Sequence, residues 1–200
     1  MSRQWVGRRR WLLRSWQDPV GRCLTRNART IFAVVALLVI VVDVISKVWV
    51  VSQLIGRAPV KLFGGLIYVT HLRNTGAAFN IGDRFTIGLS LMAIIVVISV
   101  SVLSRRVISS AWAIALGLLV GGAAGNLIDR LLRAPGPLRG AVVDFISVAD
   151  PVSPPWPVFN LADSALVVGV VLLLSLELLG RTSAFQPRRV PPADGGHNAE

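Results

Sequence analysis

The sequence predicts an all-α membrane protein with four transmembrane helices and a small β-rich segment on the membrane surface. Of its 200 residues, 54% are hydrophobic and 16% are charged, whereas soluble domains have about 45–50% apolar and about 25% charged residues. The mean hydropathy is +0.66. A spanning helix needs about 20 mostly apolar residues, and four stretches supply them: 31–50, 85–103, 108–128 and 158–180.

The segment 1–30 is strongly basic and precedes the first span. It holds eight arginines and one acidic residue, Asp18, in a chain whose net charge is +11. Because this block adjoins an apolar helix and contains three tryptophans, it predicts a cytoplasmic flank that faces anionic membrane lipids. A nucleic-acid-binding function is disfavoured for the same reason.

The first span, 31–50, carries two charged residues, Asp43 and Lys47. Its length and its charges do not fit a cleaved signal peptide, so we expect a retained helix. The two residues are four apart, a spacing that favours an ion pair within the helix that faces the bundle. A supporting role at a functional site is the alternative interpretation.

The segment 51–84 follows the first span and is too apolar to be freely solvated. Residues 60–70 alternate loosely between apolar and polar types and are rich in β-forming residues. We therefore expect short strands that lie on the membrane surface.

The second and third spans, 85–103 and 108–128, contain no charged residue. Gly117, Gly121 and Gly125 recur every four residues, which predicts close approach of a neighbouring helix. Asn126, Asp129 and Arg130 follow at the end of the third span. An ion pair at a helix end is the favoured interpretation for Asp129, but it is also a candidate catalytic carboxylate.

Four spans place both chain ends on one side of the membrane, and the basic flanks make that side the cytoplasm. Arg105 and Arg106, between the second and third spans, agree with this orientation. The domain organisation is then a basic segment 1–30, a membrane domain 31–180 and a disordered cytoplasmic tail 181–200. The polar residues of the membrane domain converge at its outer end.

Asp144 and Asp163 are the most informative of these polar residues. Asp144 interrupts an apolar run that we expect to form a loop, and Asp163 begins the fourth span, 158–180. Two adjacent carboxylates share a proton, so that one activates water while the other polarises a carbonyl. Capping of the fourth helix is an equally good interpretation of Asp163 alone.

Other chemistries have weaker support. Ser46 and Lys47 are adjacent, so they do not share a helix face as a serine–lysine peptidase requires. A small transporter or proton channel that uses Asp43, Asp129 and Asp163 predicts polar residues at every depth, whereas they gather at one end. One cysteine and two histidines make a zinc site improbable.

Five motifs occur in an order typical of one family. They are Asp43-x-x-x-Lys47, Asn74-Thr-Gly-Ala-Ala-Phe79, Gly125-Asn-Leu-Ile-Asp-Arg130, Val142-Val-Asp-Phe145 and Phe159-Asn-Leu-Ala-Asp-Ser164. With these motifs, the sequence resembles the bacterial lipoprotein signal peptidases, also called signal peptidase II, over about residues 31–180.

This resemblance implies an aspartic endopeptidase of the bacterial inner membrane whose active site is at the outer face. Such enzymes remove signal peptides from prolipoproteins and cut before the diacylglyceryl-modified cysteine. They need no metal or other cofactor, and globomycin-type cyclic peptides inhibit them. The family's catalytic pair falls on Asp144 and Asp163. Its residues that line the substrate site fall on Asn74, Asn126, Arg130 and Asn160, with Asp43, Lys47 and Asp129 in supporting positions.

Overall fold

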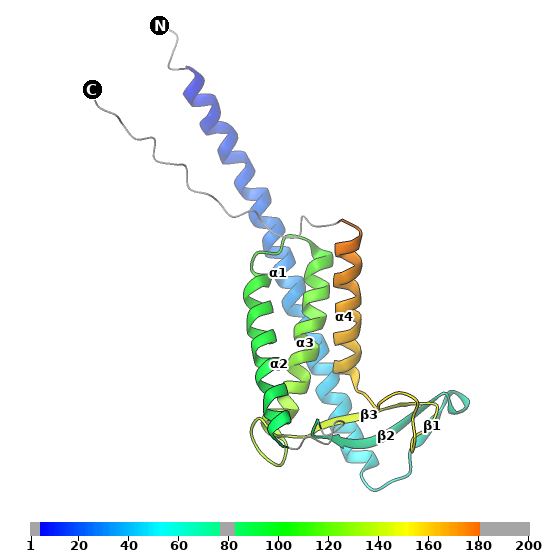
Figure 1. Ribbon diagram of the computed structural model, residues 1–200. Helices are drawn as coiled ribbons and strands as arrows, with labels where there is room; N and C mark the ends of the chain where they lie inside the picture. The colour runs from blue at the N-terminus through cyan, green and yellow to red at the C-terminus, as the bar shows by residue number, and fades with distance from the viewer. Residues whose placement is uncertain (1–4, 77–82, 181–200) are drawn as a thin grey trace.

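The computed structural model describes residues 5–76 and 83–180, as four long helices with a three-stranded sheet at one end of the bundle (Figure 1). All four helices contain a stretch long and apolar enough to cross a membrane. The predicted four-span architecture with a small sheet is therefore confirmed. The helices are α1 (Trp5–Leu54), α2 (Asp83–Ser104), α3 (Ser110–Leu132) and α4 (Leu161–Leu178), and the strands are β1 (Val60–Leu62), β2 (Ile67–Asn74) and β3 (Val142–Val148).

The helix ends differ from the predicted spans, by one to four residues except at the start of α1. α1 runs without interruption from Trp5, so no structural break separates the segment 1–30 from the first span. α4 begins at Leu161, three residues later than predicted, because Asn160 caps it. The predicted tail 181–200 lies outside the described residues.

α3 is the central helix of the bundle. In its apolar window 61% of the residues are buried, against 11–17% in the other three spans. A Cβ atom added at Gly117 would lie 3.0 Å from the side chain of Val35 on α1, and one added at Gly121 would lie 2.7 Å from the side chain of Val39. The predicted close helix approach is thus confirmed, and it lets α1 and α3 pack with their backbones in near contact.

The sheet has the strand order β1-β2-β3 with antiparallel neighbours. The strands expected within 60–70 are present, joined by a short 3₁₀ turn, Phe63–Gly65, and β2 continues to Asn74. The expected loop around Asp144 is wrong, because this residue lies within β3. The β-branched residues Val142, Val143 and Ile146 favour that strand.

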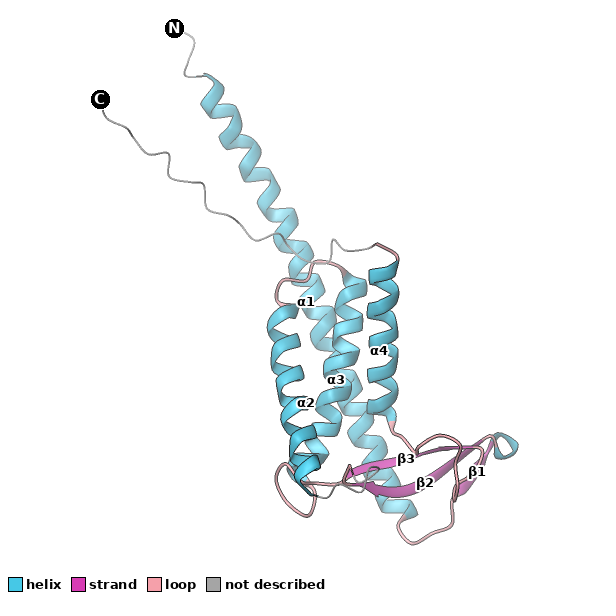
Figure 2. Ribbon diagram, in the orientation of Figure 1, coloured by secondary structure: helices cyan, strands magenta, loops and turns pink. Residues whose placement is uncertain are grey.

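Phe159 connects the sheet to the bundle. Its carbonyl oxygen accepts from the backbone N–H groups of Phe145 (3.0 Å) and Ile146 (2.8 Å), and its own N–H donates to Ile146 (3.0 Å). This bridge holds the start of α4 against β3. The sheet projects sideways beyond the bundle, at the end opposite to the start of α1 and the end of α4 (Figure 2).

Candidate active site

Asp144, which is buried, and Asp163, which is half-buried, belong to one hydrogen-bond network. The side chain of Asn160 donates to Asp144 Oδ1 (2.7 Å), and that of Asn126 donates to Asp163 Oδ1 (2.7 Å). The two amides are themselves joined, since Asn160 Nδ2 lies 3.1 Å from Asn126 Oδ1. Strand β3, the last turns of α3 and the start of α4 thus bring the two predicted carboxylates into one network.

Neutral side chains donate hydrogen bonds to both carboxyl oxygens of Asp144. Its second oxygen accepts from Asn74 Nδ2 (2.8 Å), and Asn74 is oriented by a bond from the backbone N–H of Gly76 (2.8 Å). Burial, helped by the nearby charge of Asp163, raises the pKa of Asp144 to about 6, although the bonds from Asn74 and Asn160 oppose the rise. A carboxyl group with this pKa holds or releases a proton near neutral pH.

Asp163 also caps its helix. Asn160 Oδ1 accepts from the backbone N–H of Asp163 (2.9 Å), and Asp163 Oδ2 accepts from the backbone N–H of Asn160 (3.2 Å). This is a capping box, so the capping interpretation of Asp163 is confirmed. Capping occupies one carboxylate oxygen, and the other points into the network.

Lys47 lies at the centre of a second group of charges. Its Nζ atom is 2.7 Å from Asp43 Oδ2 and 3.0 Å from Asp129 Oδ2, and Asp43 and Lys47 are fully buried. The predicted ion pair within α1 is therefore confirmed. The contact with Asp43 Oδ2 lacks hydrogen-bond alignment, but Asp43 Oδ1 accepts from the backbone N–H of Ala162 at the start of α4 (2.9 Å).

Asp129 is held by this second group and by the backbone of β3. Besides Lys47, its Oδ2 atom accepts from the backbone N–H of Val143 (3.2 Å), and its Oδ1 atom pairs with the guanidinium of Arg133. Arg133 was missed by the sequence reasoning, although its i+4 spacing from Asp129 was a usable signal. We call Asp43, Lys47, Asp129 and Arg133 the ion-pair cluster.

The remaining candidates lie between the two groups. Asn126 Oδ1 accepts from Lys47 Nζ (3.0 Å), so Asn126 links the ion-pair cluster to Asp163. Arg130 donates to the backbone carbonyl of Asn126 (3.3 Å), and its charge interacts with those of Asp163 and Asp144. The sequence candidates therefore converge at one end of the bundle, as expected.

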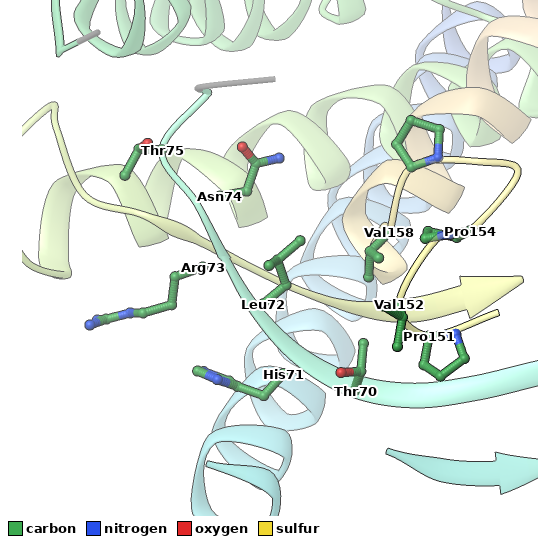
Figure 3. A pocket seen from close by; sticks show the side chains of 11 residues that line it. Thr70, His71, Leu72, Arg73, Asn74, Thr75, Pro151, Val152, Pro154 and Val158 are labelled. Atoms are coloured by element: carbon green, nitrogen blue, oxygen red, sulfur yellow. The ribbon is translucent and has the colours of Figure 1, made fainter. Parts of the chain in front are cut away.

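A groove of about 420 Å³ adjoins this network (Figure 3). One side is formed by β2 residues from Thr70 to Asn74 with Thr75, and the other by the loop that follows β3. Asn74 lines the groove and also donates to Asp144, so the groove leads to the carboxylates. The loop side is formed by Pro151, Val152, Pro154, Pro157 and Val158.

Comparison with known families gives a consistent result. Residues 35–179 match the family described as signal peptidase (SPase) II. The chain is 45% identical over 165 residues to the lipoprotein signal peptidase of Mycolicibacterium smegmatis, covering 82% of this chain and 68% of that protein. It is 42% identical over 171 residues to that of Rhodococcus jostii, covering 84% of each.

The fold is also similar to solved structures of bacterial membrane enzymes. One has a TM-score of 0.63 and 28% identity, over 74% of this chain and 92% of that chain. Another has a TM-score of 0.62 and 26% identity, over 80% and 94% of the two chains. The helix bundle and its sheet are thus an arrangement that solved membrane enzymes share.

Proposed function

Because this chain belongs to the signal peptidase II family, we propose that it is an aspartic endopeptidase that removes signal peptides from diacylglyceryl-modified prolipoproteins, cutting before the lipid-bearing cysteine. The observation that carries the aspartic mechanism is the network of Asp144 and Asp163, in which neutral amides contact both carboxyl groups. Such surroundings allow one proton to be shared between them.

The pair divides the chemistry between its two members. Asp163 lies at the N-terminal end of α4, where the helix dipole favours a negative charge, and it accepts a proton from the attacking water. Asp144, whose pKa is raised to about 6, donates its proton to the scissile carbonyl oxygen. The resulting diol then collapses: Asp163 gives its proton to the leaving nitrogen, Asp144 takes a proton back from a diol hydroxyl, and the C–N bond breaks. The two carboxyl groups titrate as one coupled system.

The other candidates position this pair. Asn74, Asn126 and Asn160 orient the two carboxyl groups, and Arg130 adds a positive charge beside them. The ion-pair cluster fixes α1, α3 and the start of α4 relative to one another. Globomycin-type inhibitors, which the family resemblance implies, would compete for the same site.

The proposed location is the bacterial inner membrane, with both chain ends in the cytoplasm and the site at the outer face. The turn between α2 and α3 lies at the end of the bundle opposite to the sheet (Figure 1), and the sequence puts Arg105 and Arg106 in this turn, in agreement with the positive-inside rule. Arg29 donates to the backbone carbonyl of Arg105 (2.7 and 3.1 Å), which ties α1 to the turn between α2 and α3.

The alternative of a transporter or proton channel is not favoured. The family and the relatives are peptidases, and the described ionisable residues that are buried in the spans lie at the sheet end. A proton path would need such groups along the membrane depth.

A gel-shift assay tests the proposal. The purified protein in lipid should convert a diacylglyceryl prolipoprotein to its shorter form, and Asp144→Asn and Asp163→Asn should each reduce the rate at least about 10³-fold. Both variants should still insert in the membrane. Full activity of either variant would exclude the aspartic mechanism, and proton flux without cleavage would restore the transporter interpretation.

A further inference from the structure

Two buried hydroxyl groups tie the start of α2 to loops at the sheet end. Thr86 Oγ1 donates to the backbone carbonyl of Thr75, and Ser90 Oγ donates to that of Leu138 (2.7 Å). Thr86 is 2% exposed and Ser90 is 0% exposed. Because a buried hydroxyl is costly unless it is hydrogen-bonded, these two bonds constrain where the loops lie. The proposed mechanism uses neither hydroxyl.

The bond from Thr86 reaches a peptide unit that also contacts the active site. Thr75 directly follows the end of β2 (Figure 3). The peptide unit between Thr75 and Gly76 contains the carbonyl that accepts from Thr86, and its N–H donates to Asn74 Oδ1 (2.8 Å). A peptide unit is planar, so its carbonyl and its N–H are rigidly oriented with respect to each other. The bond that holds the carbonyl therefore fixes the direction of the N–H as well.

Asn74 carries this orientation to the proposed catalytic pair. Because its Oδ1 atom accepts from the N–H of Gly76, its Nδ2 atom faces Asp144 and donates to Oδ2 (2.8 Å). The hydrogen bonds thus form one chain, from Thr86 through the peptide unit and Asn74 to Asp144. Bonds in such a chain polarise and strengthen one another.

We propose that Thr86 is a positioning residue for the cleavage reaction, because it orients the Asn74 amide toward Asp144 through the peptide unit between Thr75 and Gly76. The proposal rests on the proposed peptidase function. It gives α2, which carries none of the candidate residues predicted from the sequence, a direct connection to the active site.

The orientation of Asn74 matters because its bond stabilises the charged form of Asp144. Burial raises the pKa of Asp144 to about 6, and the bond from Asn74 is the largest effect that opposes this rise. The charged groups that also act on Asp144 are Asp163 on α4, Lys47 on α1 and Arg130 on α3. Loss of the α2 hydroxyl removes none of these charges, so it should act on Asp144 through Asn74.

Substitutions of Thr86 in the full-length enzyme test the connection. Thr86→Val nearly keeps the shape of the side chain and removes its hydroxyl. It should move the alkaline limb of the kcat/KM profile up by at most about one pH unit, and by no more than Asn74→Ala does. Thr86→Ser keeps the donor and should restore the profile, and Thr86→Cys, with its weak S–H donor, should lie between. An unchanged limb in Thr86→Val would overturn the proposal.

Ser90→Ala is the matched control. It removes an equally buried hydroxyl about one turn further along α2, which donates to a different loop. Both variants should lower the thermal midpoint, but Ser90→Ala should leave the alkaline limb in place. Equal shifts of the limb in Ser90→Ala and Thr86→Val would overturn the positioning role, because both hydroxyls would then act only through the stability of α2.

A double variant tests whether Thr86 acts through Asn74. The variant with both Asn74→Ala and Thr86→Val should have the same alkaline limb as Asn74→Ala alone. Additive shifts would show a different route and overturn the proposal. The NMR chemical shift of the Asp144 carboxyl carbon follows the same pKa without substrate, so it tests the connection separately from cleavage. Absence of cleavage by the unmodified enzyme would instead refute the peptidase function.

Discussion

Two groups of carboxylates adjoin each other at the sheet end of the bundle, and their partners differ. Asp43 and Asp129 are paired with the cations of Lys47 and Arg133. Asp144 and Asp163 instead accept from the amides of asparagine side chains and from backbone N–H groups. A paired cation strongly favours the charged form of a carboxylate, whereas at Asp144 burial and the nearby charge of Asp163 outweigh the amide donors and raise the pKa. The same residue type thus serves structure in one group and is suited to chemistry in the other.

The sharpest way to separate the groups is to compare Asp129→Asn with Asp144→Asn. Asp144→Asn should reduce kcat at least about 10³-fold with little change in the thermal midpoint. Asp129→Asn should lower the thermal midpoint clearly and keep measurable cleavage, because it weakens the ion-pair cluster and removes no group that contacts Asp144 or Asp163. Cleavage rates and unfolding curves in the same detergent measure both effects. The opposite pattern would make Asp129 the catalytic carboxylate.

Removal of the central cation should have the next largest effect. Lys47→Met leaves Asp43 and Asp129 buried without their shared partner, so the free energy of unfolding should fall by about 3–5 kcal/mol. Lys61→Met, at an exposed position on β1, is the control and should change it by less than about 0.5 kcal/mol. Equal unfolding midpoints for the two variants would show that the cluster contributes nothing to stability.

The raised pKa of Asp144 predicts a pH dependence of stability. Its pKa is about 6 in the folded protein against an ordinary value of 3.8, so the folded state binds more protons between these values. As the pH rises from about 4 to 7, the unmodified protein should therefore lose about 1–3 kcal/mol of stability relative to Asp144→Asn. Denaturation of both proteins at pH 4 and at pH 7 measures the difference between their free energies of unfolding. The same difference at both pH values would contradict the raised pKa.

Loss of the Asn74 amide should produce the smallest effect. This side chain stabilises the charged form of Asp144, so Asn74→Ala should raise the pKa of Asp144 further. The alkaline limb of the kcat/KM profile should then move up by less than about one pH unit. Ser147 lies on β3, as Asp144 does, but its hydroxyl donates to the backbone carbonyl of Asp150. Ser147→Ala should therefore leave the alkaline limb in place. A downward shift would contradict the role assigned to Asn74.

Several parts of the fold follow from local sequence alone. Four apolar stretches of helix length require four spans in a bilayer. The spacing of Gly117 and Gly121 predicted close packing, and the pattern of 60–70 predicted strands. The strand at Asp144 was missed, although Val142, Val143 and Ile146 were a usable β signal.

The sequence by itself determined that acidic residues gather at one end of the membrane domain, because the order of spans fixes which segments lie at that end. It left Asp129 and Asp144 as rivals for the partner of Asp163. The pairs Asp43–Lys47 and Asp129–Arg133 are local, with an i, i+4 spacing. Only the tertiary structure decided that Lys47 also reaches Asp129 and that asparagine amides contact Asp144 and Asp163, since these contacts join residues far apart in the chain. No local pattern encodes such contacts.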